Sequence, residues 1–264
     1  VFYHLFFNAF QPESMMDVRS RNIMDPDKRV GERISKLSEE EMGFHNISMV
    51  MQNGERAKFD VEGTILIVYL NDPIPPHAST LLELDFNSQV PIQIRRSGRD
   101  NKEGVDYSMT QWYPKLCEYD EEGWHSNPYI GREFNPVWGN FDVTISIDSS
   151  YLIGGTGYLQ NPQEIGHGYE DKSIPLTKPN SSKLKWHFKA PMVHDFAWAA
   201  DPEFVHETKT GENDMLFHFI HLDNEKTKDW SELPDFADKG FRFLSQTFGQ
   251  YPYKQYTFIQ GGDG

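Results

Sequence analysis

The sequence of 264 residues contains a single cysteine, Cys117, so no disulfide bond can form within the chain. A run of about 18 apolar residues, which a transmembrane helix would need, is also absent. Basic residues are scarce, because 25 Lys and Arg stand against 40 Asp and Glu, and the formal charge is −15. Nucleic acids and anionic membranes repel a chain this acidic, so neither is expected as a partner.

Both ends of the sequence have the pattern of internal positions. The chain begins with Val1 in an apolar segment, VFYHLFF, that is typical of the middle of a strand and lacks the basic flank of a signal peptide. It stops in the glycine-rich run 260–264 directly after a strand pattern. We therefore expect a piece of a longer protein. The compartment stays open, an exported bacterial protein being one option, and so does the oligomeric state.

Most of the chain has the periodicity of β-strands. Apolar and polar residues alternate in four segments, which places one face of each on a core: 47–51, 82–86, 141–147 and 184–190. A longer apolar run, 58–70, is interpreted as a central strand. Turn residues separate these runs at Asn53-Gly54, Asn71-Asp72-Pro73 and Gly154-Gly155. This pattern predicts a mainly β fold, either a sandwich or an open curved sheet.

The last fifth of the chain has a different pattern. Pro234 suits the first turn of a helix and Gly249 the position just after its end, with apolar residues at three-to-four spacing between them. A strand-like run, 256–259, follows. A β-α-β pattern is therefore predicted from about Met215, with a domain boundary near 206 that divides the chain into a β-rich domain, 1–205, and a second domain, 206–264.

The ten histidines offer little basis for a metal site. His218 and His221 lie three apart in a predicted strand and so point to opposite faces. His187 and His194 are expected to have hydrogen-bonded structural roles. The sequence has no HExxH motif and no pair of cysteines. No metal site is predicted from these residues alone.

Two further segments have the composition of functional loops. Gly154–Gly157 lies between two strand patterns rather than between a strand and a helix, so a tight hairpin is preferred to a phosphate-binding loop. Residues 95–140 are rich in aromatic residues and have no clear period. Their aromatic side chains either line a substrate cleft or are buried against the sheets: Trp112, Tyr113, Trp124, Tyr129 and Trp138.

Five segments, in order along the chain, resemble motifs of the aminopeptidase N-like gluzincin zinc metallopeptidases. They are 109–114 (MTQWYP), 141–160 (FDVTISIDSSYLIGGTGYLQ), 186–191 with 196–199 (WHFKAP and FAWA), 243–253 (FL followed by FGQYPY) and 261–264 (GGDG). The last segment falls where the G-x-M-E-N motif of that family would begin.

This resemblance implies a fold and an activity. The fold would be a curved β-sandwich or saddle over 1–205, lacking its first strands, and then the first β-α-β part of a thermolysin-like catalytic domain. In the family, HExxH and a distant Glu bind zinc, which activates the water that attacks the peptide bond after the N-terminal residue. None of these zinc-site residues lies in this chain, so the resemblance implies a zinc aminopeptidase in the parent and an inactive, metal-free fragment.

Four residues take substrate-binding roles by the same resemblance. Gln111 matches the Gln that lines the first side-chain pocket of the substrate. Tyr113 stands where many members have a Glu that binds the free amine of the substrate, and a neutral Tyr pairs with an ammonium less strongly. Gly264 matches the first Gly of G-x-M-E-N or the residue just before it, where the backbone runs beside the substrate. Asp263 matches the pocket-lining stretch that leads into this motif, where a carboxylate would favour a basic N-terminal residue.

Two other functions remain open. The chain could be a non-catalytic β-sandwich module that binds peptide or carbohydrate through its aromatic loop, because aromatic faces suit both ligands. It could also belong to a zinc-less scaffold protein of the same family. The residues that follow Gly264 in the parent protein would distinguish the three.

Overall fold

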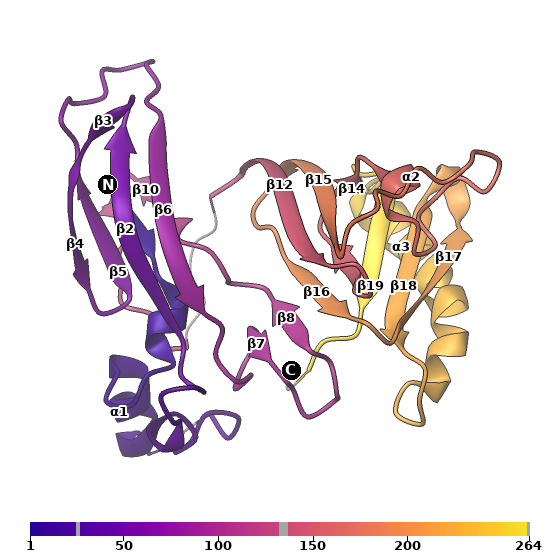
Figure 1. Ribbon diagram of the computed structural model, residues 1–264, viewed down its shortest axis with the longest axis horizontal. Coiled ribbons are helices and arrows are strands. Elements are labelled where there is room, and N and C mark those ends of the chain that lie inside the picture. Colours follow the sequence, from indigo (N-terminus) through magenta and orange to yellow (C-terminus); the bar gives the residue numbers. More distant parts are fainter. Residues whose placement is uncertain (25–26, 132–136, 263–264) are drawn as a thin grey trace. The chain divides into compact units, whose positions relative to one another are not determined.

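The computed structural model describes residues 1–24, 27–131 and 137–262. These residues form two compact units (Figure 1), each treated separately below. Unit 1 holds residues 1–101 and 109–137, and unit 2 holds residues 102–108 and 138–262, in both cases within the described ranges. Among the described residues, no helix has the length and apolar character needed to cross a membrane.

Unit 1 is built on two small sheets. The first has the strand order β4-β5-β1-β9, with bounds Lys58–Glu62, Ile65–Tyr69, Phe2–His4 and Lys115–Leu116. The second has the order β3-β2-β6, with bounds Glu55–Arg56, Phe44–Gln52 and Leu82–Gln89. The remaining elements are β7 (Gly98–Arg99), the β10–β11 hairpin (Tyr119–Asp120 and Gly123–Trp124), α1 (Met15–Asn22) and two 3-10 helices, Phe6–Ala9 and Ile34–Lys36.

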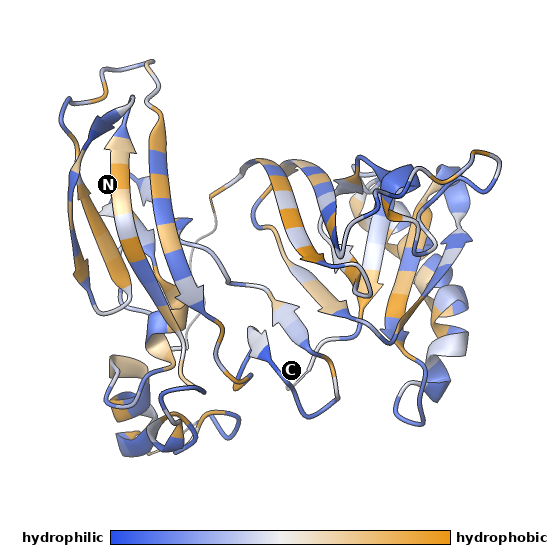
Figure 2. Cartoon of the chain, in the orientation of Figure 1, coloured by the Kyte–Doolittle hydropathy of each residue, from blue (hydrophilic) through white to orange (hydrophobic). Residues whose placement is uncertain are grey.

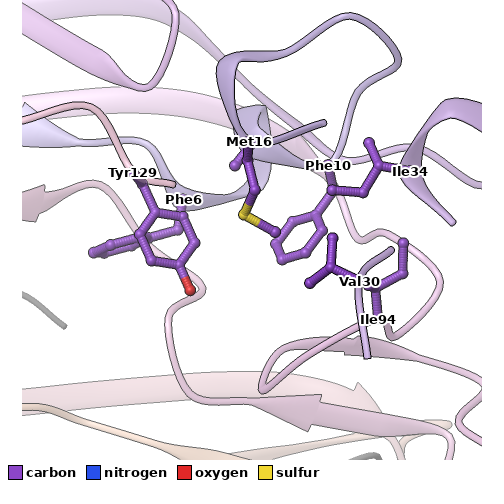
Figure 3. Packing of buried hydrophobic residues seen from close by; sticks show 8 residues of the cluster. Phe6, Phe10, Met16, Val30, Ile34, Ile94 and Tyr129 are labelled. Carbon is purple, nitrogen blue, oxygen red and sulfur yellow. The ribbon is translucent and has the colours of Figure 1, made fainter. Parts of the chain in front are cut away.

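The alternating patterns at 47–51 and 82–86 lie in the paired strands β2 and β6, as predicted. The inward residues of β2 join a cluster with residues of β5 and the first turn of the chain: Leu5, Ile47, Val50, Ala57, Leu66 and Val68. A second cluster packs around the helices of unit 1 (Figure 3). In it, the rings of Phe6 and Tyr129 meet edge to face, with their centroids 5.0 Å apart.

The prediction of one central strand over 58–70 is wrong. The segment forms an antiparallel hairpin of β4 and β5, in which Lys58 is opposite Tyr69 and Glu62 is opposite Ile65. Gly63 lies in the turn with a φ of +57°, a conformation that glycine adopts without steric cost. Only β5 is largely buried, while β4 is mostly exposed. The apolar run therefore joined an exposed and a buried strand across a turn that periodicity does not reveal.

Unit 2 contains three groups of strands. One sheet has the order β12-β15-β14, with bounds Gly139–Asp148, Lys183–Val193 and Tyr158–Leu159. Strands β13 (Leu152–Gly155), β16 (Trp198–Asp201) and β8 (Tyr107–Met109) are neighbours in that order. The third sheet has the order β17-β18-β19, with bounds Phe204–Thr210, Leu216–Leu222 and Gln255–Ile259. The helices are α2 (Pro162–Ile165), α3 (Leu233–Phe248) and two 3-10 helices, Glu212–Asp214 and Lys228–Glu232.

Strands β12 and β15 are the long pair of unit 2, and both were predicted from alternation. They pair antiparallel from Asp148 opposite Lys183 to Gly139 opposite Val193, with one irregularity near Gly139. Figure 2 shows alternating hydrophobic and hydrophilic bands along them. The inward residues of β15 are fully or almost fully buried: Leu184, Trp186, Phe188 and Ala190.

The β-α-β pattern predicted from residue 215 is present. Strands β18 and β19 pair in parallel, and α3 lies between them in the chain. The helix has a Pro in its first turn and ends at Phe248, directly before Gly249, whose φ is +103°. Its inner side packs against the third sheet through Ala237 and Phe241, next to Phe217 and Phe219. Parallel strands need a crossover connection of this kind, which explains the position of the helix.

The expected tight hairpin at Gly154–Gly157 is corrected by the structure. Gly154 and Gly155 lie inside β13 and pair with Ala199 and Trp198 of β16. A Cβ atom on Gly154 would lie 2.8 Å from Ile259 Cδ1 and 2.9 Å from Ile220 Cδ1, so the missing side chain makes room for the third sheet. The turn lies at Thr156 and Gly157 and connects strands of two different sheets.

The compact units divide the chain differently from the boundary expected near residue 206. Residues on both sides of 206 belong to unit 2, where β13 packs on β18 and β19. The two-domain division at 206, which was placed where the sequence pattern changes, remains a prediction. The mainly β class is confirmed.

Candidate functional site

The segment with the predicted substrate residues lies in unit 1, between β8 and β9. Ser97 fixes its backbone, because the Ser97 hydroxyl accepts hydrogen bonds from the N–H groups of Thr110 at 3.2 Å and Gln111 at 2.8 Å. The hydroxyl groups of Ser97 and Thr110 are 3.1 Å apart. Ser97 is only 2% exposed, so water does not compete for these bonds. One serine thus determines where the Gln111 backbone lies.

The structure places two of the four predicted substrate residues. Gln111 is almost fully buried, with 6% of its surface exposed. Tyr113 is half-buried, and its ring meets that of Trp112 with a centroid distance of 5.3 Å. Asp263 and Gly264 lie outside the described residues. Gln111 and Tyr113 therefore share one segment held by Ser97, and their roles toward a substrate remain predictions.

Replacing Ser97 with alanine is expected to lower the free energy of unfolding by about 1–3 kcal/mol, because the buried N–H of Gln111 and the partly buried N–H of Thr110 lose their acceptor. Urea unfolding followed by circular dichroism measures the change. Ser146→Ala is the matched control, since Ser146 lies on the exposed face of β12, and its effect should stay within about 0.5 kcal/mol. Equal effects of the two substitutions would show that Ser97 does not anchor the segment.

The aromatic side chains of 95–140 have different environments. Tyr129 is buried in the second cluster of unit 1, the one around its helices, as expected for a loop whose aromatics pack inward. Trp124 lies between Phe2 and Tyr119, with centroid distances of 5.6 Å and 5.2 Å. Trp138, in unit 2, is 58% exposed. Packing against neighbouring side chains thus explains the aromatic residue at position 129 fully and the one at position 124 in part. A role of this segment in a substrate cleft stays a prediction.

The histidines are used in local structural contacts. His187 Nε2 lies 2.7 Å from Asp142 Oδ1 on the exposed face of β12 and β15, which confirms its predicted structural role. The hydrogen bond from His187 lowers the pKa of the Asp142 carboxyl. His221 lies against Trp230, with a centroid distance of 4.8 Å, whereas His218 has other neighbours. Sequence reasoning compared His218 with His221 and missed His206, whose Nε2 is 2.7 Å from His218 Nδ1.

A pair of carboxylates in unit 2 was also missed. Asp201 is buried and accepts the backbone N–H groups of Asp106 at 2.9 Å and Glu203 at 2.8 Å. Burial raises the pKa of Asp201, and its hydrogen bonds oppose that shift. The Tyr151 hydroxyl donates to Asp106 at 2.6 Å, and this bond is the largest cause of the raised pKa of Tyr151. Since each carboxylate accepts these donors, the pair stabilises the segment that precedes β8.

No set of three or more His, Cys, Asp or Glu side chains in the described parts of the chain comes together as metal ligands. The His206–His218 pair has two such groups and lacks a third. A structural zinc site normally has four protein ligands, and a catalytic site three and a water. Hydrolysis by zinc therefore cannot be assigned to the described residues.

Sequence comparisons give no relatives. No family model matches the chain, and no curated protein matches it.

The fold does have counterparts among solved structures. An M1 zinc metallopeptidase mutant from Deinococcus radiodurans superimposes with a TM-score of 0.53 at 18% identity, and the alignment covers 81% of this chain and 46% of that one. A two-domain M1 zinc metallopeptidase mutant bound to L-arginine gives a TM-score of 0.54 at 16% identity, with the same coverage. Legionella pneumophila aminopeptidase A, in complex with aspartic acid, gives 0.51 at 13% identity, covering 81% of this chain and 23% of that one.

The architecture is thus that of a mainly β protein with one β-α-β unit. More specifically, it is similar to the fold of part of the M1 zinc metallopeptidases, which agrees with the resemblance found in the sequence. At 13–18% identity, the match concerns the fold. The chain spans less than half the length of these structures.

Proposed function

We propose that this chain is a part of a zinc-dependent aminopeptidase of the M1 family, which removes N-terminal residues from peptides. The observation that carries the proposal is the fold match over 81% of the chain at a TM-score of 0.54. The order of the five sequence motifs supports the proposal independently, because it depends on residue identities, whereas the fold match depends on the path of the backbone. In this proposal the β-rich part is a curved sandwich, and β17, β18, α3 and β19 begin a thermolysin-like catalytic domain.

The zinc of the parent enzyme would be bound by residues outside this chain. The described residues offer no set of three ligands, as stated above, so they do not fit a zinc site. When bound, zinc would polarise the scissile carbonyl group and lower the pKa of the attacking water. The chain itself would contribute substrate contacts alone and would be inactive in isolation.

Three side chains would contribute these contacts. Gln111, on the segment fixed by Ser97, would line the pocket for the first substrate side chain. Tyr113 would lie near the substrate amine, where a neutral hydroxyl group can accept a hydrogen bond from it. Asp263 would favour a basic first residue by charge attraction. One solved structure of similar fold is described as bound to L-arginine and another as bound to a Tyr-Ser-Ala substrate, so this fold accommodates first residues of different kinds.

An arylamide assay tests the proposal on two proteins, this chain alone and the full-length protein that contains it. The full-length protein should release arylamine from Ala- and Arg-arylamides, lose this activity on dialysis against a chelator and regain it with zinc. The N-acetylated substrates should not be cleaved, because the free amine is part of recognition. The chain alone should show no turnover with added zinc.

Each other outcome contradicts a stated part of the proposal. Turnover by the chain alone would show that its own residues form an active centre. A folded full-length protein without zinc-dependent activity would contradict the peptidase and favour the scaffold or the binding module. Equal rates for Arg and Ala substrates would contradict only the role of Asp263.

A further inference from the structure

Residues 166–170, which follow α2, form a short segment across unit 2 that is here called the strap. The His167 ring donates a hydrogen bond from Nε2 to the Ser149 carbonyl oxygen at 3.1 Å. The Tyr169 hydroxyl donates to the Ile153 carbonyl oxygen, also at 3.1 Å. The strap is thereby fixed to the segment around β13.

The other contact of the strap is with two histidines of the third sheet. The ring of Tyr169 has its centroid 4.3 Å from that of His206 on β17 and 5.2 Å from that of His218 on β18. The Nδ1 atom of His206 lies 3.0 Å from the carbonyl oxygen of His167. His206 therefore connects the strap to the sheet by both a hydrogen bond and ring packing.

The hydrogen bonds determine which nitrogens carry protons. A carbonyl oxygen can only accept, so His206 Nδ1 carries the hydrogen that bonds to His167. Neutral His206 then has a lone pair on Nε2, which accepts from Nδ1–H of His218 at 2.7 Å. If both rings were protonated, two N–H groups would face each other at this distance. The pair is therefore built for neutral histidines and can take at most one extra proton with its hydrogen bonds intact.

The environment of the His206–His218 pair disfavours the binding of even one extra proton. Burial is the largest cause that lowers the pKa of both rings, and together with the neighbouring His206 it lowers the pKa of His218 to about 4. The charged groups near the strap are Glu170, which acts on His206 and His167, and Lys178, which acts on His167. Gln255, from β19, is neutral and raises the pKa of His218 only in part. Tyr169 is neutral over this range, because burial raises its pKa.

Gly168 allows the strap to approach the ring of His206. Its φ is +85°, and a Cβ atom there would lie 2.9 Å from His206 Nδ1. An alanine would both strain the backbone and push the strap away from His206. The contact thus depends on one position that can be changed without changing a titratable group.

We propose that the His206–His218 pair is an acid-sensitive latch, which holds the strap on the third sheet at neutral pH and releases it when the pair is protonated. Release would expose Trp186, whose ring centroid lies 5.8 Å from those of Tyr169 and His167. The latch is independent of the proposed peptidase activity.

The direction of the pH effect follows from proton linkage. A histidine whose pKa is lower in the closed state binds protons better in the open state, so closure is favoured above pH 6.5 and weakens as the pH falls toward 4. For His218 alone, the ratio of closed to open strap should fall about 20-fold between pH 7 and pH 5. Protonation of His206 in the open state would add to this effect.

Hydrogen exchange measured by mass spectrometry tests the latch on the whole chain. Protection factors, corrected for the intrinsic effect of pH on exchange, should fall about 20-fold for peptides covering 166–170 between pH 7 and pH 5. Peptides of α3 should change much less. A strap whose protection is constant over this range, or falls only in parallel with α3, would overturn the proposal.

Two variants and a control separate the latch from general acid instability. His218→Asn retains a donor near the Nδ1 position but cannot take a proton, so the strap should lose the part of its pH dependence that His218 contributes and keep only the smaller part that comes from His206 and His167. Gly168→Ala should lower strap protection already at pH 7. His125→Asn, at a histidine paired with Asp120 in unit 1, should behave as the unsubstituted chain. If His218→Asn retained the full pH dependence, the pair would not be the sensor.

A measurement on the unsubstituted chain covers the case in which a variant fails to fold. The ring protons of His218 should titrate well below pH 6.5 in an NMR pH series, together with shifts of Tyr169. Titration of His218 near its ordinary value, without a change at Tyr169, would contradict the latch.

Discussion

Replacing Trp186 with alanine is expected to lower the free energy of unfolding by about 3–5 kcal/mol. Trp186 is 0% exposed and lies in the middle of β15, opposite Ile145 of β12. Its ring is nearly parallel to that of Phe188, with the centroids 6.2 Å apart, and meets Tyr169 edge to face. Truncation would leave a cavity between β15 and the strap that neither neighbour can fill without moving.

Urea unfolding followed by far-UV circular dichroism measures this change, because a fluorescence signal would itself change with the loss of a tryptophan. Trp138→Ala is the control, since Trp138 is mostly exposed and should cost about 1 kcal/mol or less. Trp186→Phe adds a second test. The indole N–H has no hydrogen-bond partner among the described residues, so phenylalanine should recover most of the loss. A small effect of Trp186→Ala would show that β15 does not carry the core of unit 2.

Replacing Gly157 with alanine is expected to lower the free energy of unfolding by about 3 kcal/mol. The φ of Gly157 is +82°, which is costly for any residue with a Cβ atom. A Cβ atom there would also lie 2.4 Å from the Lys189 carbonyl oxygen and 2.6 Å from the Ala190 Cβ atom. Both contacts are to β15 itself, and a backbone in the middle of a sheet cannot move aside easily.

Gly240→Ala is the matched control for this prediction. Gly240 lies inside α3, and apart from its chain neighbours and the backbone of the helix itself, nothing lies within 4 Å of the position where its Cβ atom would be. Alanine is the better helix former, so this substitution should stabilise the protein by about 0.5–1 kcal/mol. Replacing glycine with alanine should thus lower the free energy of unfolding at position 157 and raise it at position 240. Thermal unfolding of the two variants measures both, and destabilisation by Gly240→Ala would show that α3 is packed differently.

The sequence indicated several elements of the fold correctly, and each had a strong local signal. β12 and β15 alternate over their whole length, and α3 has a Pro at its start, a Gly after its end and a regular apolar spacing. Periodicity and turn residues gave wrong element boundaries where those boundaries depend on which strand pairs with which. A turn at Gly63 splits the run 58–70, and Gly154 and Gly155, which have the local character of turn residues, lie in β13.

The contacts of the candidate site were harder to predict from the sequence than the fold. The motif resemblance selected Gln111 and Tyr113, but nothing in the sequence connects Ser97 with Gln111, fourteen residues away. His206 and His218 are twelve residues apart and carry no shared motif. They meet because β17 and β18 pair antiparallel across a short connection. A predicted pairing of these two strands would have indicated the contact, because Thr208 is opposite His218 and His206 lies two residues away on the same face of β17.

The sequence by itself determined the mainly β class, the helix between β18 and β19, the acidic character of the chain and the order of motifs that resembles the aminopeptidase N-like peptidases. These properties depend on periodicity, composition and local turn chemistry, which are encoded over a few residues. Only the tertiary structure decided that Ser97 holds the Gln111 segment, that Gly157 must lack a side chain, and that the strap is joined to His206. These contacts connect positions far apart in the chain, and packing rather than local preference selects them.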